Sequence, residues 1–292
     1  MGVGPVGLMS LISSIAHHSF RNVSTLYLSG NPIGGEGANH LILLLERSLS
    51  LTALDVSGCS LQDEGVQKIA QGLERNERLE YIDLGDNDVS DYGVNTVAAM
   101  LAAKGKRAIN RQHLFPFSLK RIVLSTNNIT STGFGQFAAA VTIAHLSTIE
   151  LSSCKITDNG CRAFSQHLAN NRTLKLIDLS SNLLTADGVW VLAESIIANR
   201  SIESLRINDN RLLDSGGRGI ATILNGNHHI QEVNVAGNGI GPKGLIPILK
   251  VLMMRPVPLE LHIHGNPYQR DAKCLEYISK LEGMNRIVSV NQ

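Results

Sequence analysis

The stretch of sequence that decides the fold is LKLIDLSSNLLTADG, residues 174–188. It carries aliphatic residues at its first, fourth, sixth and eleventh positions, asparagine at its ninth and glycine at its last. The same pattern recurs in residues 79–93, 202–216 and 230–244. Self-similarity of this kind indicates a repeat architecture, in which each unit buries its aliphatic side chains against its neighbours.

The asparagine position, which is filled twice by cysteine, measures the repeat. Its nine occurrences are separated by 28, 28, 40, 27, 28, 28, 28 and 28 residues. They are Asn31, Cys59, Asn87, Asn127, Cys154, Asn182, Asn210, Asn238 and Asn266. A length of 292 residues would by itself suggest two domains. The regular spacing favours one repetitive domain over residues 1–292 instead.

Each part of the unit has a physical role. Leucines at alternate positions face one side of a short strand, and the asparagine can bond backbone groups left unpaired where the chain turns inward. Cys59 and Cys154 are interpreted as small buried residues in the same position. The glycine permits a tight turn, after which apolar residues return at helical spacing, as at Val189, Leu192 and Ile196. Strands pack about 4.8 Å apart and helices about 8–10 Å apart, so strands line the inside of a curve.

These residues resemble the leucine-rich repeat superfamily, and specifically its ribonuclease-inhibitor-like class. That resemblance implies an α/β fold: a right-handed solenoid, or horseshoe, of about nine repeats. Parallel strands would form its concave face and helices its convex face. The class includes ribonuclease inhibitor, the sensing domains of NLR immune receptors, the GTPase-activating protein of Ran, the C-terminal domain of tropomodulin and a ciliary dynein-regulatory subunit. The resemblance is therefore specific for the fold and leaves the function open.

The pattern is incomplete at the N-terminus. Residues 2–8 match residues 239–245, so residues 1–20 form a partial first repeat that lacks its strand. Solenoid ends need a polar cap, and none precedes this repeat. Either the sequence is a fragment or shortened product, or a neighbouring subunit or second copy covers this edge. Residues 267–292 are expected to form a C-terminal capping region with a helix and a final strand.

The gap of 40 residues contains a basic insertion, residues 104–115, that has no acidic residue. We expect it to leave the preceding helix as a loop at one edge of the solenoid. Insertions of this kind often bind partners, and the alternative is a solvated loop without function. Its candidate partner-binding residues are Lys104, Lys106, Arg107 and Arg111.

No catalytic or cofactor-binding constellation emerges, so we expect neither an enzyme nor a cofactor. The GxGxxG strings in residues 2–7 and 239–244 are repeat turns without the strand and helix context of a dinucleotide site. Glu260, His262 and His264 alternate on one strand and are weak metal candidates, but an incomplete ligand set favours no metal site.

The exposed positions of the strands are the default docking surface of a solenoid. Acidic residues dominate them, and tyrosine and arginine are the residue types that most often anchor interfaces. Acidic residues are also common at these positions of the repeat whether or not they bind anything. The candidate partner-binding residues are Tyr27, Asp55, Tyr81, Asp83, Arg121, Glu150, Asp178 and Arg206.

We therefore expect a non-enzymatic protein–protein interaction scaffold or adaptor that is a subunit of a larger assembly. It would bind a protein through the concave face, the basic insertion or both. A net charge of +1 argues against a nucleic-acid partner, and no apolar run is long enough to span a membrane. Four cysteines are too few for a disulfide framework, which favours the cytoplasm, with a cytoskeletal or ciliary location open. The alternatives are a GTPase activator resembling the Ran regulator, an axonemal dynein-regulatory subunit and a sensor fragment of an NLR-like receptor.

Overall fold

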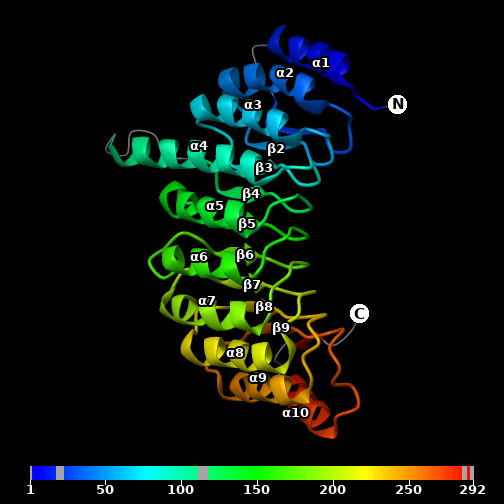
Figure 1. The fold of residues 1–292 in the computed structure, drawn as a ribbon, viewed down its shortest axis with the longest axis vertical. Coiled ribbons are helices and arrows are strands. Elements are labelled where there is room, and N and C mark those ends of the chain that lie inside the picture. Colours follow the sequence, from blue (N-terminus) through cyan, green and yellow to red (C-terminus); the bar gives the residue numbers. More distant parts are fainter. Residues whose placement is uncertain (1, 18–22, 111–117, 285–287, 290–292) are drawn as a thin grey trace. The chain divides into compact units, whose positions relative to one another are not determined.

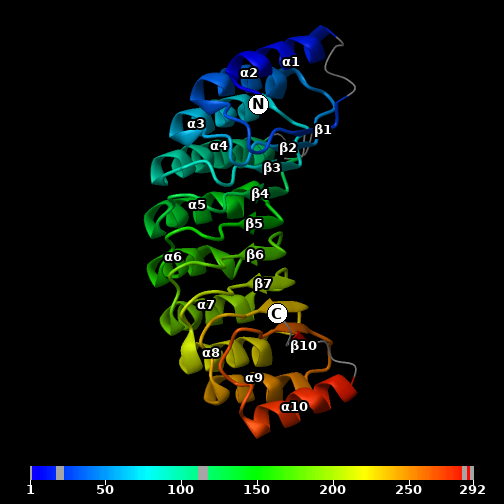
Figure 2. The same ribbon diagram turned by 90° about the vertical axis from the view of Figure 1, so that its right-hand side faces the viewer.

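The structure is a computed structural model that describes residues 2–17, 23–110, 118–284 and 288–289. The chain divides into two compact units, Met1–Cys154 and Lys155–Gln292. Within each unit short strands alternate with helices, and the strands lie on one side and the helices on the other (Figures 1 and 2). None of the described helices is long and apolar enough to cross a membrane.

The described residues of the first unit form ten elements in strict alternation. Its helices are α1 (Pro5–His17), α2 (Gly34–Arg47), α3 (Gln62–Arg75), α4 (Asp91–Asn110) and α5 (Ser131–Ala144). Its strands are β1 (Thr25–Tyr27), β2 (Ala53–Asp55), β3 (Tyr81–Asp83), β4 (Arg121–Val123) and β5 (Thr148–Glu150).

The second unit repeats the same alternation. Its helices are α6 (Asp158–Leu168), α7 (Ala186–Ala198), α8 (Leu213–Gly226), α9 (Pro242–Met254) and α10 (Ala272–Gly283). Its strands are β6 (Leu176–Asp178), β7 (Ser204–Arg206), β8 (Glu232–Asn234), β9 (Glu260–His262) and β10 (Val288–Ser289). The expected C-terminal helix and final strand are thus α10 and β10, and β10 pairs with β9.

Successive strands pair in parallel within each unit, one residue to one residue. In β2 to β5 the middle residue of each strand is at most 1% exposed, and it packs toward the helices: Leu54, Ile82, Ile122 and Ile149. The predicted solenoid of parallel strands backed by helices is confirmed by this register.

The asparagines predicted from the spacing form a hydrogen-bonded ladder between repeats. Asn87 Oδ1 accepts from the backbone N–H groups of Cys59 (2.9 Å) and Leu61 (3.1 Å) in the preceding repeat. Its Nδ2 donates to the carbonyls of Val56 and Gly85, each at 2.9 Å. One side chain therefore satisfies four backbone groups, two of them donors in the neighbouring repeat.

The two ladder cysteines make weaker contacts at the same position. Cys59 Sγ lies 3.1 Å from the carbonyl of Leu28, and Cys154 Sγ lies 3.6 Å from that of Leu124. Burial raises the pKa of both thiols, so both stay protonated at neutral pH.

A second ladder, which the sequence pattern did not predict, runs along the C-terminal ends of the helices. Asn199 Nδ2 donates to the carbonyls of Leu168 (2.8 Å) and Asn171 (2.9 Å), and its Oδ1 accepts from Ser201 and Ile202 N–H. Equivalent side chains that bond the backbone are Ser48, Asn76, Lys104, Asn171, Asn227 and Arg255.

The glycine that ends the repeat motif has a different role from the one expected. Gly93 does not have a positive φ, so turn geometry does not require it. A Cβ atom there would lie against the carboxylate of Asp63 and 2.7 Å from Val89 Cγ1. Asp63 Oδ1 accepts from the N–H groups of Ser90 (2.8 Å) and Gly93 (3.1 Å) at the start of α4. The glycine makes room for this carboxylate of the preceding repeat.

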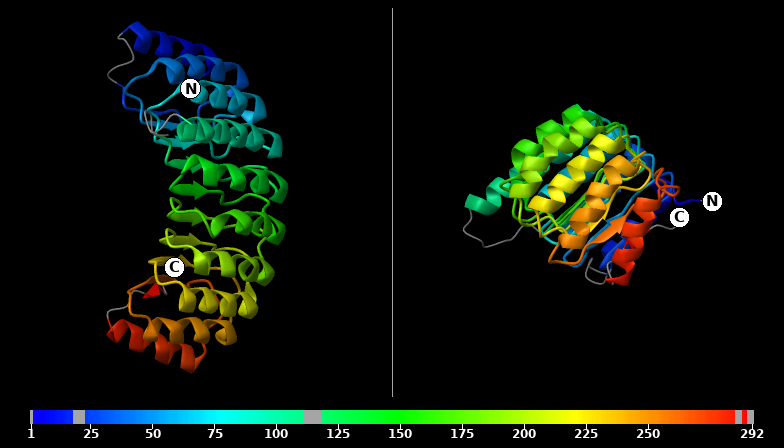
Figure 3. Two further views of the ribbon diagram at one scale, coloured as in Figure 1. Left: turned by 90° about the vertical axis from the view of Figure 1, so that its left-hand side faces the viewer. Right: turned by 90° about the horizontal axis from the view of Figure 1, so that it is seen from below.

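The insertion begins as helix, so the expected loop is wrong for residues 104–110. The 20-residue helix α4 projects beyond α3 and α5 (Figures 1 and 3). Helices α2 and α3 end where Ser48 and Asn76 leave helical geometry. Lys104 stands at this position in α4, and its Nζ reaches the carbonyls of Leu73 (2.8 Å) and Asn76 while its backbone stays helical. Residues 111–117 lie outside the described residues.

Candidate protein-binding face

We define the strand face as the first and third residues of the strands in each unit. The middle residue of these strands points into the core, so its two neighbours point away from the helices. Every strand-face residue proposed from the sequence lies in this position. They are Tyr27, Tyr81, Asp55, Asp83, Arg121 and Glu150 in the first unit, and Asp178 and Arg206 in the second.

The first unit brings four of these residues into one connected group. The hydroxyl of Tyr81 donates to Asp83 Oδ2 at 3.1 Å. The guanidinium of Arg121 lies 4.9 Å from the centroid of the Tyr81 ring, and its Nε donates to Glu150 Oε1 at 2.7 Å. Each residue comes from a different strand or register position, so adjacent repeats are linked by side chains as well as by backbone.

The charge of this group is unbalanced toward the acidic side. Asp55 and Asp83 are register partners on adjacent strands, and like charges in this arrangement repel. No lysine or arginine among the described residues forms an ion pair with either carboxylate, because Arg121 pairs with Glu150. Burial, with the negative charge of Asp55, raises the pKa of the Asp83 carboxyl. Burial and the charge of Asp83 likewise raise the pKa of Tyr81, so its hydroxyl stays a donor at neutral pH.

The second unit holds its predicted arginine in an ion pair. Arg206 donates to Glu232 through Nε at 3.0 Å and through a terminal nitrogen at 3.2 Å, and Ser204 Oγ donates to the same carboxylate at 2.8 Å. Burial alone would raise the pKa of Glu232, but these hydrogen bonds outweigh it and lower the pKa. Asp178 accepts from the backbone and side chain of Ser180.

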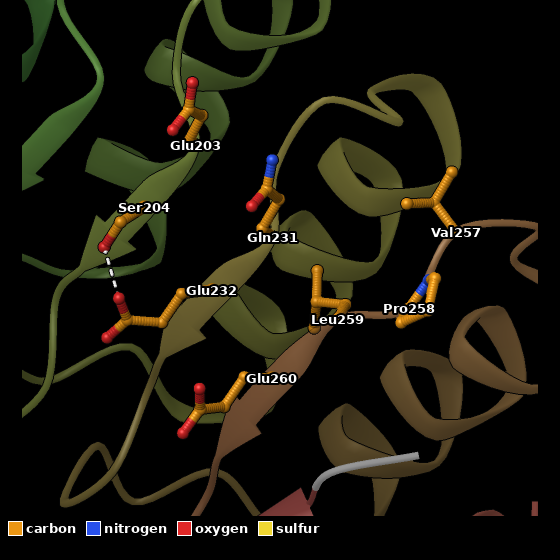
Figure 4. Close-up of a pocket in the computed structure, with 8 residues that line it drawn as sticks. All are labelled: Glu203, Ser204, Gln231, Glu232, Val257, Pro258, Leu259 and Glu260. Atoms are coloured by element: carbon orange, nitrogen blue, oxygen red, sulfur yellow. Dashed lines mark hydrogen bonds between the residues drawn. The ribbon is translucent and has the colours of Figure 1, made fainter. Parts of the chain in front are cut away.

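A pocket of about 610 Å³ lies beside this ion pair, and sequence reasoning missed it (Figure 4). Three glutamates from successive repeats lie along one side, and Val257 and Pro258 lie on the other. The residues that line it are Glu203, Ser204, Gln231, Glu232, Val257, Pro258, Leu259 and Glu260. The available signals were the 28-residue spacings of Glu203 with Gln231 and of Glu232 with Glu260. The segment 256–258 departs from the repeat pattern and gave no signal.

The basic residues of the insertion have separate environments. Lys104 is partly buried and donates to helix-end carbonyls, and burial lowers its pKa to about 8. Lys106 and Arg107 are exposed on the projecting part of α4. Arg111 lies outside the described residues. Of the four candidates, only Lys106 and Arg107 are therefore described as exposed side chains.

The weak metal candidates make a local contact with each other. His262 Nε2 lies 3.1 Å from Glu260 Oε1 on β9. Among the described residues, no group of three or more histidine, cysteine, aspartate or glutamate side chains is placed to hold a metal ion.

Comparison with known proteins supports the reading of the repeats. A family model described as Leucine Rich repeat matches residues 21–39, 47–70, 142–165, 198–221 and 226–249. The chain is a leucine-rich repeat protein. No curated protein matches it in sequence. The five matches fall in both units, so the repeat is recognised on either side of the insertion.

Two solved structures resemble this leucine-rich repeat protein. A Bacteroides fragilis protein is 12% identical with a TM-score of 0.53, over 91% of this chain and 73% of its own. An internalin, InlF, from Listeria monocytogenes str. 4b F2365 is 13% identical with a TM-score of 0.40, over 99% of this chain and 95% of its own. The first likeness concerns the fold alone, and the second carries no further argument.

Proposed function

We propose that this leucine-rich repeat protein is a non-enzymatic scaffold that binds a basic segment of a protein partner on the strand face of the first unit. Leucine-rich repeat domains generally mediate protein–protein interaction. The observation that carries the proposal is the pair of register-matched carboxylates, Asp55 and Asp83, neither of which forms an ion pair among the described residues.

The residues around this pair suit an interface. Tyr27 lies next to Asp55 in the register and is 67% exposed, and Tyr81 borders Asp83. Tyrosine offers a large apolar surface with a polar end, which is why it recurs among interface anchors. A lysine or arginine of the partner would relieve the repulsion between the two carboxylates and pack its aliphatic stem against Tyr27.

The repeats themselves support a finer family assignment. Most of the repeats have a helix of 11 to 14 residues, and the ladder position holds asparagine seven times and cysteine twice. We assign the chain to the ribonuclease-inhibitor-like class on this basis. We further propose that it forms one repetitive domain and acts in the cytoplasm as a subunit of a larger assembly. Lys106 and Arg107 on α4 provide a second contact of opposite charge.

The test is a quantitative affinity purification with charge-reversal variants. Asp55→Lys with Asp83→Lys alters the first unit, and Asp178→Lys alters the second. The partners that co-purify with the natural protein should be depleted by the double variant and retained by Asp178→Lys. Near-native circular dichroism would show that the double variant is folded.

Charge reversals on the helices provide the matched control. Glu36 on α2 and Glu194 on α7 are exposed and lie away from the strand face. Glu36→Lys and Glu194→Lys should leave the set of partners unchanged. The proposal fails if the double variant retains every partner, or if the helix variants deplete the same partners to the same degree.

A further inference from the structure

The pocket shown in Figure 4 lies where the segment before β9 departs from the repeat pattern. The residue that precedes a strand is exposed or half-buried in the earlier repeats, as Gln231 before β8 and Glu203 before β7 are. Leu259 holds this position before β9, and it is only 2% exposed. Pro258 is exposed, although it holds the position of the buried Ile230. The side chain that would cover this place is therefore buried, and a hollow of about 610 Å³ is left.

The same departure changes the backbone pairing at the pocket. Before β8, Glu203 C=O accepts from two N–H groups, those of Gln231 (2.7 Å) and Glu232 (3.0 Å). Before β9, Gln231 C=O accepts from Glu260 N–H at 2.7 Å, and among the described residues Leu259 N–H forms no second bond to it. A carbonyl group of a pocket residue can thus accept one more hydrogen bond than it receives from the repeat.

Glu260 lacks the arginine that its counterpart in the preceding strand has. Glu232 in β8 forms an ion pair with Arg206. Glu260 holds the register position of Glu232 one strand further along, and Asn234 holds that of Arg206. Among the described residues the ion-pair partner of Glu260 is His262, at 3.1 Å, and 45% of the glutamate side chain is exposed. This carboxylate of the pocket is therefore accessible to a guanidinium group from outside.

We propose that the pocket binds an arginine side chain from an extended segment of a protein partner. A guanidinium group carries five N–H donors in one plane, enough to bond both Glu260 and the carbonyl of Gln231. The aliphatic stem of the arginine and an apolar neighbour would pack against Val257 and Pro258 on the opposite side. The volume lies within the range of about 300–1,000 Å³ that is typical of ligand pockets. The site belongs to the second unit and is separate from the carboxylate pair proposed above.

The probe is the capped tripeptide acetyl-Leu-Arg-Leu-amide, titrated into the 15N-labelled full-length protein and followed by NMR. The backbone amide signals of Gln231, Leu259 and Glu260 should shift saturably. For so small a ligand we expect a dissociation constant on the order of 1 mM. Replacing the arginine of the probe with citrulline, which has a similar shape without the charge, should weaken binding by roughly tenfold or more.

Two protein variants alter the site in different ways. Glu260→Gln removes the negative charge, whereas Asn234→Arg keeps the carboxylate and supplies an arginine in the register position of Arg206. Both should weaken binding of the arginine probe by roughly tenfold or more and keep a cooperative urea transition. Glu194→Gln is the matched control, because Glu194 is exposed on α7. It should bind the probe within about twofold of the natural protein, since an exposed charge on the helix side is screened.

The proposal is overturned if the pocket signals do not shift saturably, or if the citrulline probe binds as tightly as the arginine probe. Equal weakening by Glu194→Gln and Glu260→Gln would also contradict it. Two further results would replace the partner with the protein itself. Pocket signals that move when the protein alone is diluted would mean that a second copy fills the site. Arg286 lies outside the described residues, and binding roughly tenfold tighter in Arg286→Gln would mean that the chain's own arginine fills it.

Discussion

At the scale of single residues, Asn87 ties two repeats together through one amide group. Its four hydrogen bonds run to two backbone donors of the preceding repeat and to two carbonyls, one in each repeat. All of these groups are removed from water. Gly85 C=O also accepts from Gly58 N–H, whereas the other three groups lose the partner that the amide supplies if it is deleted. The side chain is 1% exposed, which leaves no room for water to replace it without rearrangement.

We expect Asn87→Ala to lower the free energy of unfolding by about 3–5 kcal/mol, because an unpaired buried polar group costs about 1–3 kcal/mol. Urea denaturation followed by circular dichroism measures the change. Asn39→Ala is the control, since Asn39 is exposed on α2 and its loss should change stability by about 0.5 kcal/mol at most. Similar midpoints for the two variants would contradict the ladder.

A second residue-scale prediction concerns Gly93. Alanine favours helices over glycine by about 1 kcal/mol, yet a Cβ atom at this position would meet Asp63 and Val89. We expect Gly93→Ala to destabilise the protein by about 1–3 kcal/mol through overpacking. Gly283→Ala in α10 is the control, because a Cβ there meets no atom within 4 Å. If Gly93→Ala is as stable as Gly283→Ala, the close approach of Asp63 is not what requires glycine.

The two ladders show what sequence could and could not reveal about such residues. The first was predictable because asparagine recurs at a fixed distance from the L-x-L strand. The second has the same spacing but changes chemistry from Ser48 to Asn76 to Lys104 to Arg255. These residues share only the ability to form hydrogen bonds with the backbone. That shared ability can be recognised only when the bonded backbone groups are known from the structure.

At the scale of elements, helix α4 shows how one side chain extends a helix. Asn76 satisfies the ladder at a residue that leaves helical geometry, so α3 ends there. Lys104 satisfies the equivalent carbonyls from a longer side chain, and α4 continues to Asn110. The sequence showed that residues were inserted and that they were basic, but it offered no reason to prefer helix over loop.

We expect two substitutions at Lys104 to separate these effects. Lys104→Asn should restore the short donor and end the helix, so amide hydrogen exchange in residues 105–110 becomes fast while the urea midpoint changes little. Lys104→Met should keep the helix and remove the side-chain donor from the carbonyl of Asn76, at a cost of about 1–3 kcal/mol, while Leu73 C=O keeps the N–H of Asn76. Hydrogen exchange measured by mass spectrometry, with urea denaturation, tests both. Identical behaviour of the two variants would refute this explanation of the longer helix.

The strand face was predictable in position but not in contacts. The register placed every proposed residue on its strand, because a period of two assigns faces directly. A long side chain can reach several neighbours. The stacking of Arg121 on Tyr81 and the ion pair of Arg206 with Glu232 could therefore be identified only from the structure.

At the scale of the whole molecule, the sequence predicts one repetitive domain, and the chain contains two compact units. Stacked repeats unfold together when the interfaces between neighbours are strong compared with the repeats themselves. The 27-residue step from Asn127 to Cys154 preserves the ladder spacing almost unchanged up to the boundary between the units. We therefore predict that the repeats unfold as one cooperative system.

The single tryptophan allows this prediction to be tested. Trp190 lies in α7, so its fluorescence reports on the second unit, whereas far-ultraviolet circular dichroism reports on both. Urea transitions followed by the two signals should coincide, and Asn87→Ala in the first unit should shift both equally. A tryptophan transition that stays in place while the dichroism transition shifts would show two independent domains.

The carboxylate of Asp63, which binds the start of the next repeat, has a consequence for how such a chain can be rearranged. Asp91, Asp158 and Asp214 act in the same way on Thr130, Thr185 and Gly244. Other repeats have Gly35, Ser131, Ala186 or Pro242 at this position. A repeat with a serine or threonine and a glycine thus depends on which repeat comes before it. When these repeats are duplicated or shuffled into chimaeras, the order of the repeats therefore matters as much as their individual sequences.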